Sequence, residues 1–199
     1  MRFFKENSNI ILKLFINQIG IAIFSFFLYT IAGAIKSDDS AGFSLIIKVL
    51  LSLLSIWFYY TLIYLAMWEL GAKDKIRIDG GKSEKRISKG LLIGICANLV
   101  NFIVWGLATL FMELYMKGFG DAFFSIFGVI NGIFRIFCCM YLGVAQWISS
   151  PFAAVDNLYY LVQSFCFLGL PVITVVVTFI SYIMGLNEIK IIPSANKKK

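Results

Sequence analysis

A basic segment between two long apolar runs is the feature that most constrains this chain. It covers residues 71–89 and reads GAKDKIRIDGGKSEKRISK. Seven of its side chains are basic, and only Asp74, Asp79 and Glu84 are acidic. A basic loop between two apolar segments is retained on the cytoplasmic side of a membrane and orients its neighbours. The sequence therefore predicts an integral membrane protein whose orientation this segment sets.

The composition supports the same class. The chain is 60% hydrophobic and 15% charged, whereas soluble domains are about 45–50% apolar and about 25% charged. The net charge of +7 gathers in loops and tails rather than along one face of a domain. Such clusters are expected beside anionic lipid headgroups, so we expect the lipid bilayer as a partner and no nucleic acid. Residues 1–199 are predicted to form a single membrane domain.

Four apolar runs are long enough to cross a bilayer, which takes roughly 20 helical residues. The expected spans cover about residues 14–35, 43–69, 90–115 and 158–185. With the basic N-terminal head inside, the fold class is an all-α membrane bundle with a cytoplasmic N-terminus. Between the second and third spans, the Asp79-Gly80 pair predicts a short hairpin or turn against the headgroups.

Residues 121–150 fit two placements. Their polar and small side chains recur every three or four positions, so a helix over them carries one polar stripe. The stretch lies at the outer interface as an amphipathic or re-entrant segment, or it crosses as a fifth span. Four spans are preferred because they keep the basic tail, residues 187–199, in the cytoplasm. Four spans also keep Arg135 away from the bilayer centre, where inserting an arginine costs about 2.5–3.5 kcal/mol.

Three polar side chains of this stripe are candidates for a polar cavity or an interface, namely Asn131, Arg135 and Gln146. Arg135 is the only charge in the middle of its long apolar run. In one interpretation it faces a polar cavity and contacts an anion or substrate. In the other, which is favoured here, it meets lipid phosphate from an amphipathic helix.

Two faces have the spacing of helix-packing surfaces. Gly90 and Gly94 form a small-xxx-small pair with Asn98 one turn further on, which lets another helix approach closely. Thr174, Thr178 and Ser181 share one face of the last span. The basic side chains of the 71–89 segment are expected to contact lipid headgroups instead; they are Lys73, Lys75, Arg77, Lys82, Lys85, Arg86 and Lys89.

The residue inventory argues against an enzyme. The chain has no histidine, which excludes a histidine base, a Ser-His triad and the common zinc sites. Its four cysteines lie in apolar runs without a CxxC pair, so neither a disulfide framework nor a metal site is expected. The DGGKS sequence at 79–83 lacks the spacing of a phosphate-binding loop. We expect no cofactor.

Three segments carry a resemblance. They are FFKEN at 3–7 with the later NQIG at 17–20, WELGAKDKIRIDGG at 68–81, and KGL at 89–91. Together they resemble a family of small multi-pass bacterial membrane proteins of unknown function. The resemblance covers mainly the first half of the chain. It implies a membrane protein class and no substrate, cofactor or catalytic residue.

Two functional classes remain. The first is a non-enzymatic accessory or assembly subunit, which contacts a membrane partner or a second copy through the Gly90/Gly94 face and the Thr174 face. The alternative is a small-solute transporter or a membrane substrate-binding component, although the sequence shows no inverted repeat. In both cases the expected location is the bacterial cytoplasmic membrane.

Overall fold

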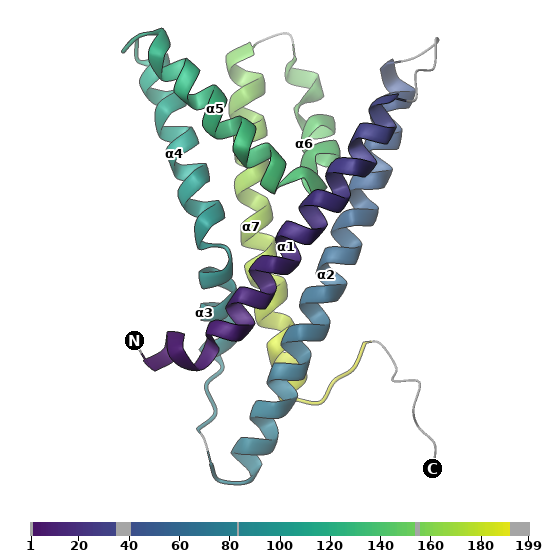
Figure 1. The fold of residues 1–199 in the computed structure, drawn as a ribbon, viewed down its shortest axis with the longest axis vertical. Helices are drawn as coiled ribbons and strands as arrows, with labels where there is room; N and C mark the ends of the chain where they lie inside the picture. The colour runs from purple at the N-terminus through teal and green to yellow at the C-terminus, as the bar shows by residue number, and fades with distance from the viewer. Residues whose placement is uncertain (1, 35–40, 83, 154–155, 192–199) are drawn as a thin grey trace.

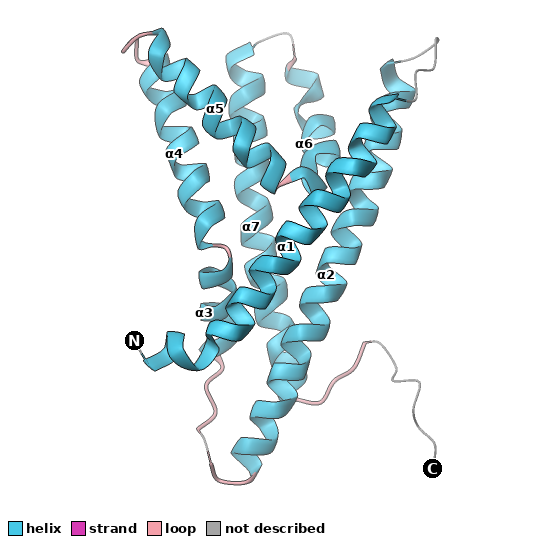
Figure 2. Ribbon diagram, viewed as in Figure 1, coloured by secondary structure: helices cyan, strands magenta, loops and turns pink. Residues whose placement is uncertain are grey.

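The structure is a computed structural model that describes residues 2–34, 41–82, 84–153 and 156–191. Within these ranges the chain is helical and contains no strand (Figure 2). The helices are α1 (Arg2–Ala34), α2 (Ala41–Asp79), α3 (Ser88–Ala97), α4 (Leu99–Met116), α5 (Asp121–Phe137), α6 (Leu142–Ser149) and α7 (Asp156–Leu186). Two short 3-10 turns flank α6, η1 (Cys139–Tyr141) and η2 (Ser150–Phe152).

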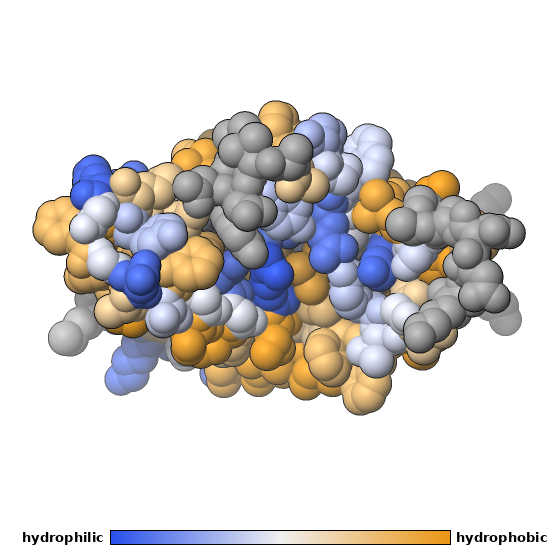
Figure 3. All heavy atoms as spheres, turned by 90° about the horizontal axis from the view of Figure 1, so that it is seen from above, coloured by the Kyte–Doolittle hydropathy of each residue, from blue (hydrophilic) through white to orange (hydrophobic). Residues whose placement is uncertain are grey.

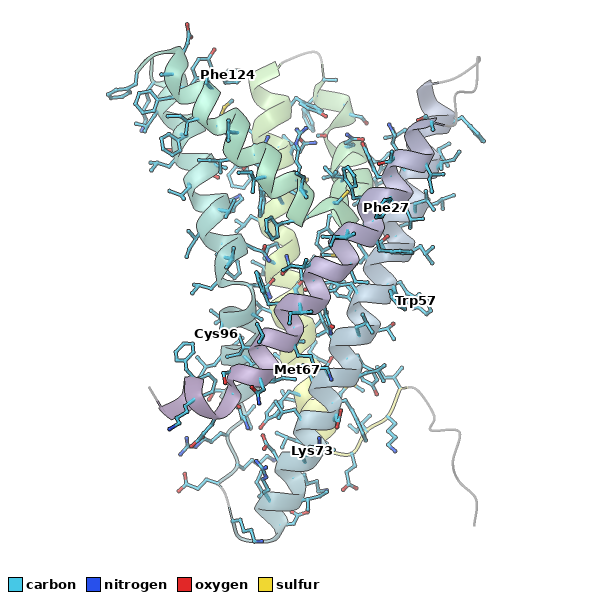
Figure 4. The ribbon with its side chains drawn as sticks, in the orientation of Figure 1. Phe27, Trp57, Met67, Lys73, Cys96 and Phe124 are labelled. Carbon is cyan, nitrogen blue, oxygen red and sulfur yellow. The ribbon has the colours of Figure 1, made fainter. Side chains whose placement is uncertain are left out.

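Four of these helices are long and apolar enough to cross a membrane, α1, α2, α4 and α7. Large apolar side chains on them point away from the bundle: Phe27 is 63% exposed and Trp57 is 67% exposed (Figure 4). Met67, on the inner face of α2, is fully buried. An apolar exterior of this extent marks a surface made for lipid or for a partner rather than for water. The predicted all-α fold with four membrane-length helices is confirmed for the described residues.

The helix that contains the second predicted span extends beyond it, because α2 continues to Asp79. The expected hairpin is wrong, since Ile76 and Ile78 lie in the helix. The expected turn is present after Asp79, where the Lys82 amide donates to the Arg77 carbonyl at 2.9 Å. No proline stands between Glu69 and Asp79, although Gly71 does, and charged pairs one turn apart support the helix there.

The third predicted span is interrupted at Asn98, which separates α3 from α4. The Asn98 side chain donates to the Gly94 carbonyl oxygen at 3.0 Å. An amide that bonds its own backbone in this way competes with the regular helix. Backbone hydrogen bonds still bridge the break, from Asn98 to Gly94 at 3.2 Å and from Phe102 to Asn98 at 3.1 Å. The two helices therefore act as one interrupted rod.

The ambiguous stretch forms a sharply bent pair. The helices on either side of Cys138 meet at 83°, and the bend, Cys139–Tyr141, is buried in the core. The pair starts and ends at the same end of the bundle, where it joins α4 and α7 (Figure 1). Of the two predicted placements, this geometry matches a re-entrant segment rather than a straight fifth span.

The N-terminus, the end of α2, the start of α3 and the end of α7 gather at the other end (Figure 1). We call this the basic end, and the end that carries the bent pair the opposite end. Residues 187–191 run back along α2: the Trp68 indole donates to the Ile189 carbonyl at 2.7 Å, and the Ile191 amide donates to the Tyr64 hydroxyl at 2.9 Å. The last three lysines of the predicted tail, Lys197–Lys199, lie outside the described residues.

Candidate functional site

The two predicted packing faces meet each other inside the chain. A methyl group on Gly90 would lie 2.7 Å from the Tyr182 Cβ atom, and one on Gly94 would lie 3.2 Å from the Thr178 Cβ atom. The small residues of α3 therefore let α7 approach closely. The hydroxyls of Thr178 and Ser181 bond to carbonyls of their own helix, each at 2.7 Å. Thr174, Thr178 and Ser181 are all buried, so this face is not open to a separate partner.

A cluster of amides ties α1 to the broken third span. Gln18 and Asn101 exchange two hydrogen bonds, both 3.0 Å long. Asn101 also donates to the Asn98 side-chain oxygen at 3.1 Å. All three side chains are buried. Amide side chains that form hydrogen bonds with each other stabilise the association of helices in an apolar environment.

The basic end contains a buried ion pair that the sequence did not indicate. The Lys89 ammonium donates to the Asp74 carboxylate at 2.6 Å, and the Tyr182 hydroxyl donates to the same oxygen at 2.9 Å. The Asp74 side chain is 9% exposed and that of Lys89 is 19% exposed. Lys89 was expected at the lipid headgroups, but the structure pairs it inside the bundle. Asp74 lies one turn after Gly71 on α2, so the two residues share a face of the helix. This spacing is the only sequence signal that the Asp74 side chain points inward.

Glycines set the crossing of α2 and α7 beside this pair. A side chain on Gly71 would overlap the Tyr182 carbonyl and lie 2.9 Å from the Leu186 nitrogen. A side chain on Gly185 would overlap the Trp68 carbonyl. Backbone therefore packs against backbone here, which brings the Tyr182 hydroxyl within reach of Asp74. Sequence reasoning placed Gly71 in a loop and missed this contact.

The other predicted headgroup residues lie nearer the surface. Lys73, Arg77, Lys82, Lys85 and Arg86 are exposed, and Lys75 is half-buried. Several have acidic neighbours: Lys73 with Glu69 at 2.6 Å, Lys75 with Glu188 at 3.5 Å, and Arg86 with Glu84 at 3.8 Å. Exposed pairs of this kind contribute about 0–1 kcal/mol each. These side chains can therefore turn toward another anion at little cost.

A pocket of about 700 Å³ opens at the basic end. Its walls come from the start of α1, the end of α2, the loop that follows it, the start of α3 and one side chain of α7. The Asp74–Lys89 pair and Tyr182 belong to its lining, as do Arg77 and Arg86. The structure thus gathers several of the predicted headgroup residues around one concave site.

Two polar side chains of the bent pair form hydrogen bonds with two different helices, α7 and α1. Arg135 donates to the Gln163 side-chain oxygen on α7, whereas Gln146 accepts a hydrogen bond from the Tyr29 hydroxyl on α1 at 2.7 Å. Asn131 is half-buried. Seen from the opposite end, hydrophilic atoms lie toward the middle and apolar atoms border them (Figure 3). Within the described residues, Arg135 Nε and Gln163 Nε2 are buried without a hydrogen-bond partner.

The described residues contain no group of three or more metal-binding side chains of the His, Cys, Asp or Glu type. The four cysteines, Cys96, Cys138, Cys139 and Cys166, are free thiols.

No family model, no curated protein and no solved structure matches the chain. The resemblance of its first half to a bacterial membrane protein family stays a prediction.

Proposed function

We propose that the chain is a multi-pass protein of a bacterial cytoplasmic membrane with its basic end in the cytoplasm. The charge pattern of α2 supports this placement: about 20 residues without a charge separate Lys48 from Glu69, which matches a hydrocarbon core of about 30 Å. The exposed basic side chains after Glu69 then meet the anionic inner leaflet. In this arrangement α1, α2, the α3–α4 rod and α7 are the four spans, and α5–α6 enters from the outer side.

Within that membrane, the chain acts as a non-enzymatic accessory or assembly subunit. The reciprocal Gln18–Asn101 pair carries this proposal, because these buried amides are bonded to each other between helices. Amides that are paired in this way are suited to helix packing rather than to conduction. Since the Gly90/Gly94 face is used within the chain, the partner or second copy contacts the apolar outer faces.

A photo-crosslinking amino acid introduced at Trp57 tests the subunit proposal. Trp57 is 67% exposed on the outside of α2, whereas Met67 on the same helix is fully buried and serves as the matched control. We expect the Trp57 position to give a discrete crosslinked species of higher mass in cells, and the Met67 position to give none. Crosslinks to lipid alone at Trp57, together with elution of the purified protein as a lone monomer, would contradict the proposal.

The orientation has a separate test. A reporter fused after Lys199, and a Lys82→Cys variant labelled with an impermeant thiol reagent, both report the side of the basic end. We expect cytoplasmic activity of the reporter and protection of the cysteine in intact cells. Labelling from outside would mean that the orientation is the reverse of the proposed one. The packing of the helices would be the same in either orientation.

A small-solute transporter is the second candidate. The interruption at Asn98 and the bent α5–α6 pair favour it, because discontinuous helices are typical of transporter binding sites. A Gln18→Cys variant separates the two candidates: reaction with a water-soluble maleimide from either face supports transport, whereas protection supports the subunit. Phe27→Cys, on the exposed outer face of α1, controls for reagent that enters through lipid.

A further inference from the structure

The pocket at the basic end has the size of a ligand site. Its volume of about 700 Å³ falls within the range of about 300–1,000 Å³ that small-molecule sites occupy. Five segments build it: the starts of α1 and α3, the end of α2, one side chain of α7, and the loop residues Lys82, Glu84 and Arg86 between α2 and α3. The Gly71–Gly185 crossing and the Asp74–Lys89 pair hold α2, α3 and α7 together, so these walls are part of the folded bundle.

The charge of the pocket suits an anion. Four basic and three acidic side chains line it, but the acidic Asp74 is already neutralised by Lys89 and hydrogen-bonded by Tyr182. Arg86 approaches Glu84 only to 3.8 Å, and Arg77 approaches Asp74 only to 3.8 Å. Both guanidinium groups therefore keep donor capacity for a further oxygen ligand.

The first turn of α3 adds backbone donors to the same wall. The helix begins at Ser88, which lines the pocket, and its N-cap residue, Ile87, makes no side-chain capping bond. The Lys89 amide of this turn already donates to the Arg86 carbonyl at 3.2 Å. The partial positive charge at the start of a helix favours phosphate. The Ser88 hydroxyl is a further donor to a phosphate oxygen.

Three apolar side chains also line the pocket, one each from α1, α2 and α3: Phe3, Ile78 and Leu92. A ligand that contacts both the basic and the apolar lining combines a phosphate group with a carbon-rich part. We propose that this pocket binds a phosphate ester, either the headgroup of an anionic phospholipid or a soluble organic phosphate. The phosphate lies between Lys82, Arg86 and the start of α3. This site does not depend on the subunit proposal, and only the choice of leaflet depends on the proposed orientation.

Native mass spectrometry of the full chain in neutral detergent tests the site. Phosphatidylglycerol, phosphatidylcholine and glycerol 3-phosphate are each added as probes. We expect the protein to retain phosphatidylglycerol or glycerol 3-phosphate in preference to phosphatidylcholine. Lys82→Gln and Arg86→Gln should each weaken that binding about fivefold, which corresponds to about 1 kcal/mol per basic residue. Both side chains are exposed, so the variants should fold.

Two further variants separate the pocket from a general basic surface. Lys73→Gln removes an exposed charge from α2 at a position outside the pocket, and this variant should leave binding unchanged. Leu92→Trp enlarges one of the apolar lining side chains without changing the charge and should abolish binding, provided that its thermal unfolding matches the unaltered protein. Retention of phosphatidylglycerol above glycerol 3-phosphate identifies a lipid site, and the reverse identifies a soluble phosphate ester. Equal losses in Lys73→Gln and Arg86→Gln, or no preference over phosphatidylcholine, would overturn the proposal.

Discussion

The two ends of the bundle bury charge in different ways. At the basic end, the Asp74 carboxylate receives a cation and a hydroxyl donor, Lys89 and Tyr182. At the opposite end, the half-buried Arg135 bonds to a neutral amide, and its Nε has no acceptor among the described residues. A buried charge needs an opposite charge and hydrogen bonds to offset the loss of water. The partner that the fold supplies, rather than the depth of burial, therefore decides what each charge does to stability.

The largest expected effect comes from breaking the pair at the basic end. Asp74→Asn leaves the Lys89 ammonium without its carboxylate, and we expect a loss of about 3 kcal/mol in the free energy of unfolding. Denaturant titration of the purified protein in detergent measures it. Asp79→Asn, exposed at the end of the same helix, should change stability by less than about 0.5 kcal/mol. The double variant Asp74→Asn/Lys89→Gln should recover part of the loss; strict additivity would show that the two residues are not coupled.

The second prediction compares two glycines at helix contacts of α2, one near each end of the bundle. Gly71→Ala forces a methyl group against the Tyr182 carbonyl of α7, and Gly143→Ala forces one against the Lys48 carbonyl of α2. Overpacking costs about 1–3 kcal/mol. We expect the larger loss at Gly71, because α7 is a long helix whereas α6 has only 8 residues and can shift. Thermal unfolding measures both. Gly106→Ala, with no atom within 4 Å, is the control, and an equal loss there would refute the packing explanation.

The smallest effect has the opposite sign. Arg135→Met/Gln163→Leu removes two buried groups that lack hydrogen-bond partners among the described residues, and we expect stability to stay unchanged or to rise by about 1 kcal/mol. The same denaturant titration reports it. A loss of more than about 2 kcal/mol would mean that the opposite end holds its arginine in a favourable network, and the contrast between the two ends would disappear.

The sequence predicted the features that depend on local pattern. Apolar runs gave the four long helices, and the spacing of Gly90 and Gly94 gave a close helix contact, which the structure places against Thr178 and Tyr182 of α7. Local pattern also showed that residues 121–150 differ from a simple span, because their polar positions recur at helical spacing.

The sequence failed where a contact joins distant segments. It assigned Gly71 and Asp74 to a loop because the charges there resemble a solvated segment, but α7 supplies a surface that keeps α2 helical to Asp79. Lys89 was expected at the headgroups for the same reason. Asp74 bonds to Lys89 and Tyr182, and Gly71 packs against Tyr182 and Gly185. No local pattern identifies these partners. The break at Asn98 likewise depends on a side chain bonding to its own backbone.

The contact between α2 and α7 also constrains how the chain is made. Asp74 and Tyr182 are 108 residues apart, and a ribosome adds about 5–20 residues per second. The nascent α2 therefore stays in the insertion machinery or the lipid for several seconds before α7 exists. A premature stop before Asp156 would remove α7 and leave the inward face of α2 permanently without that helix.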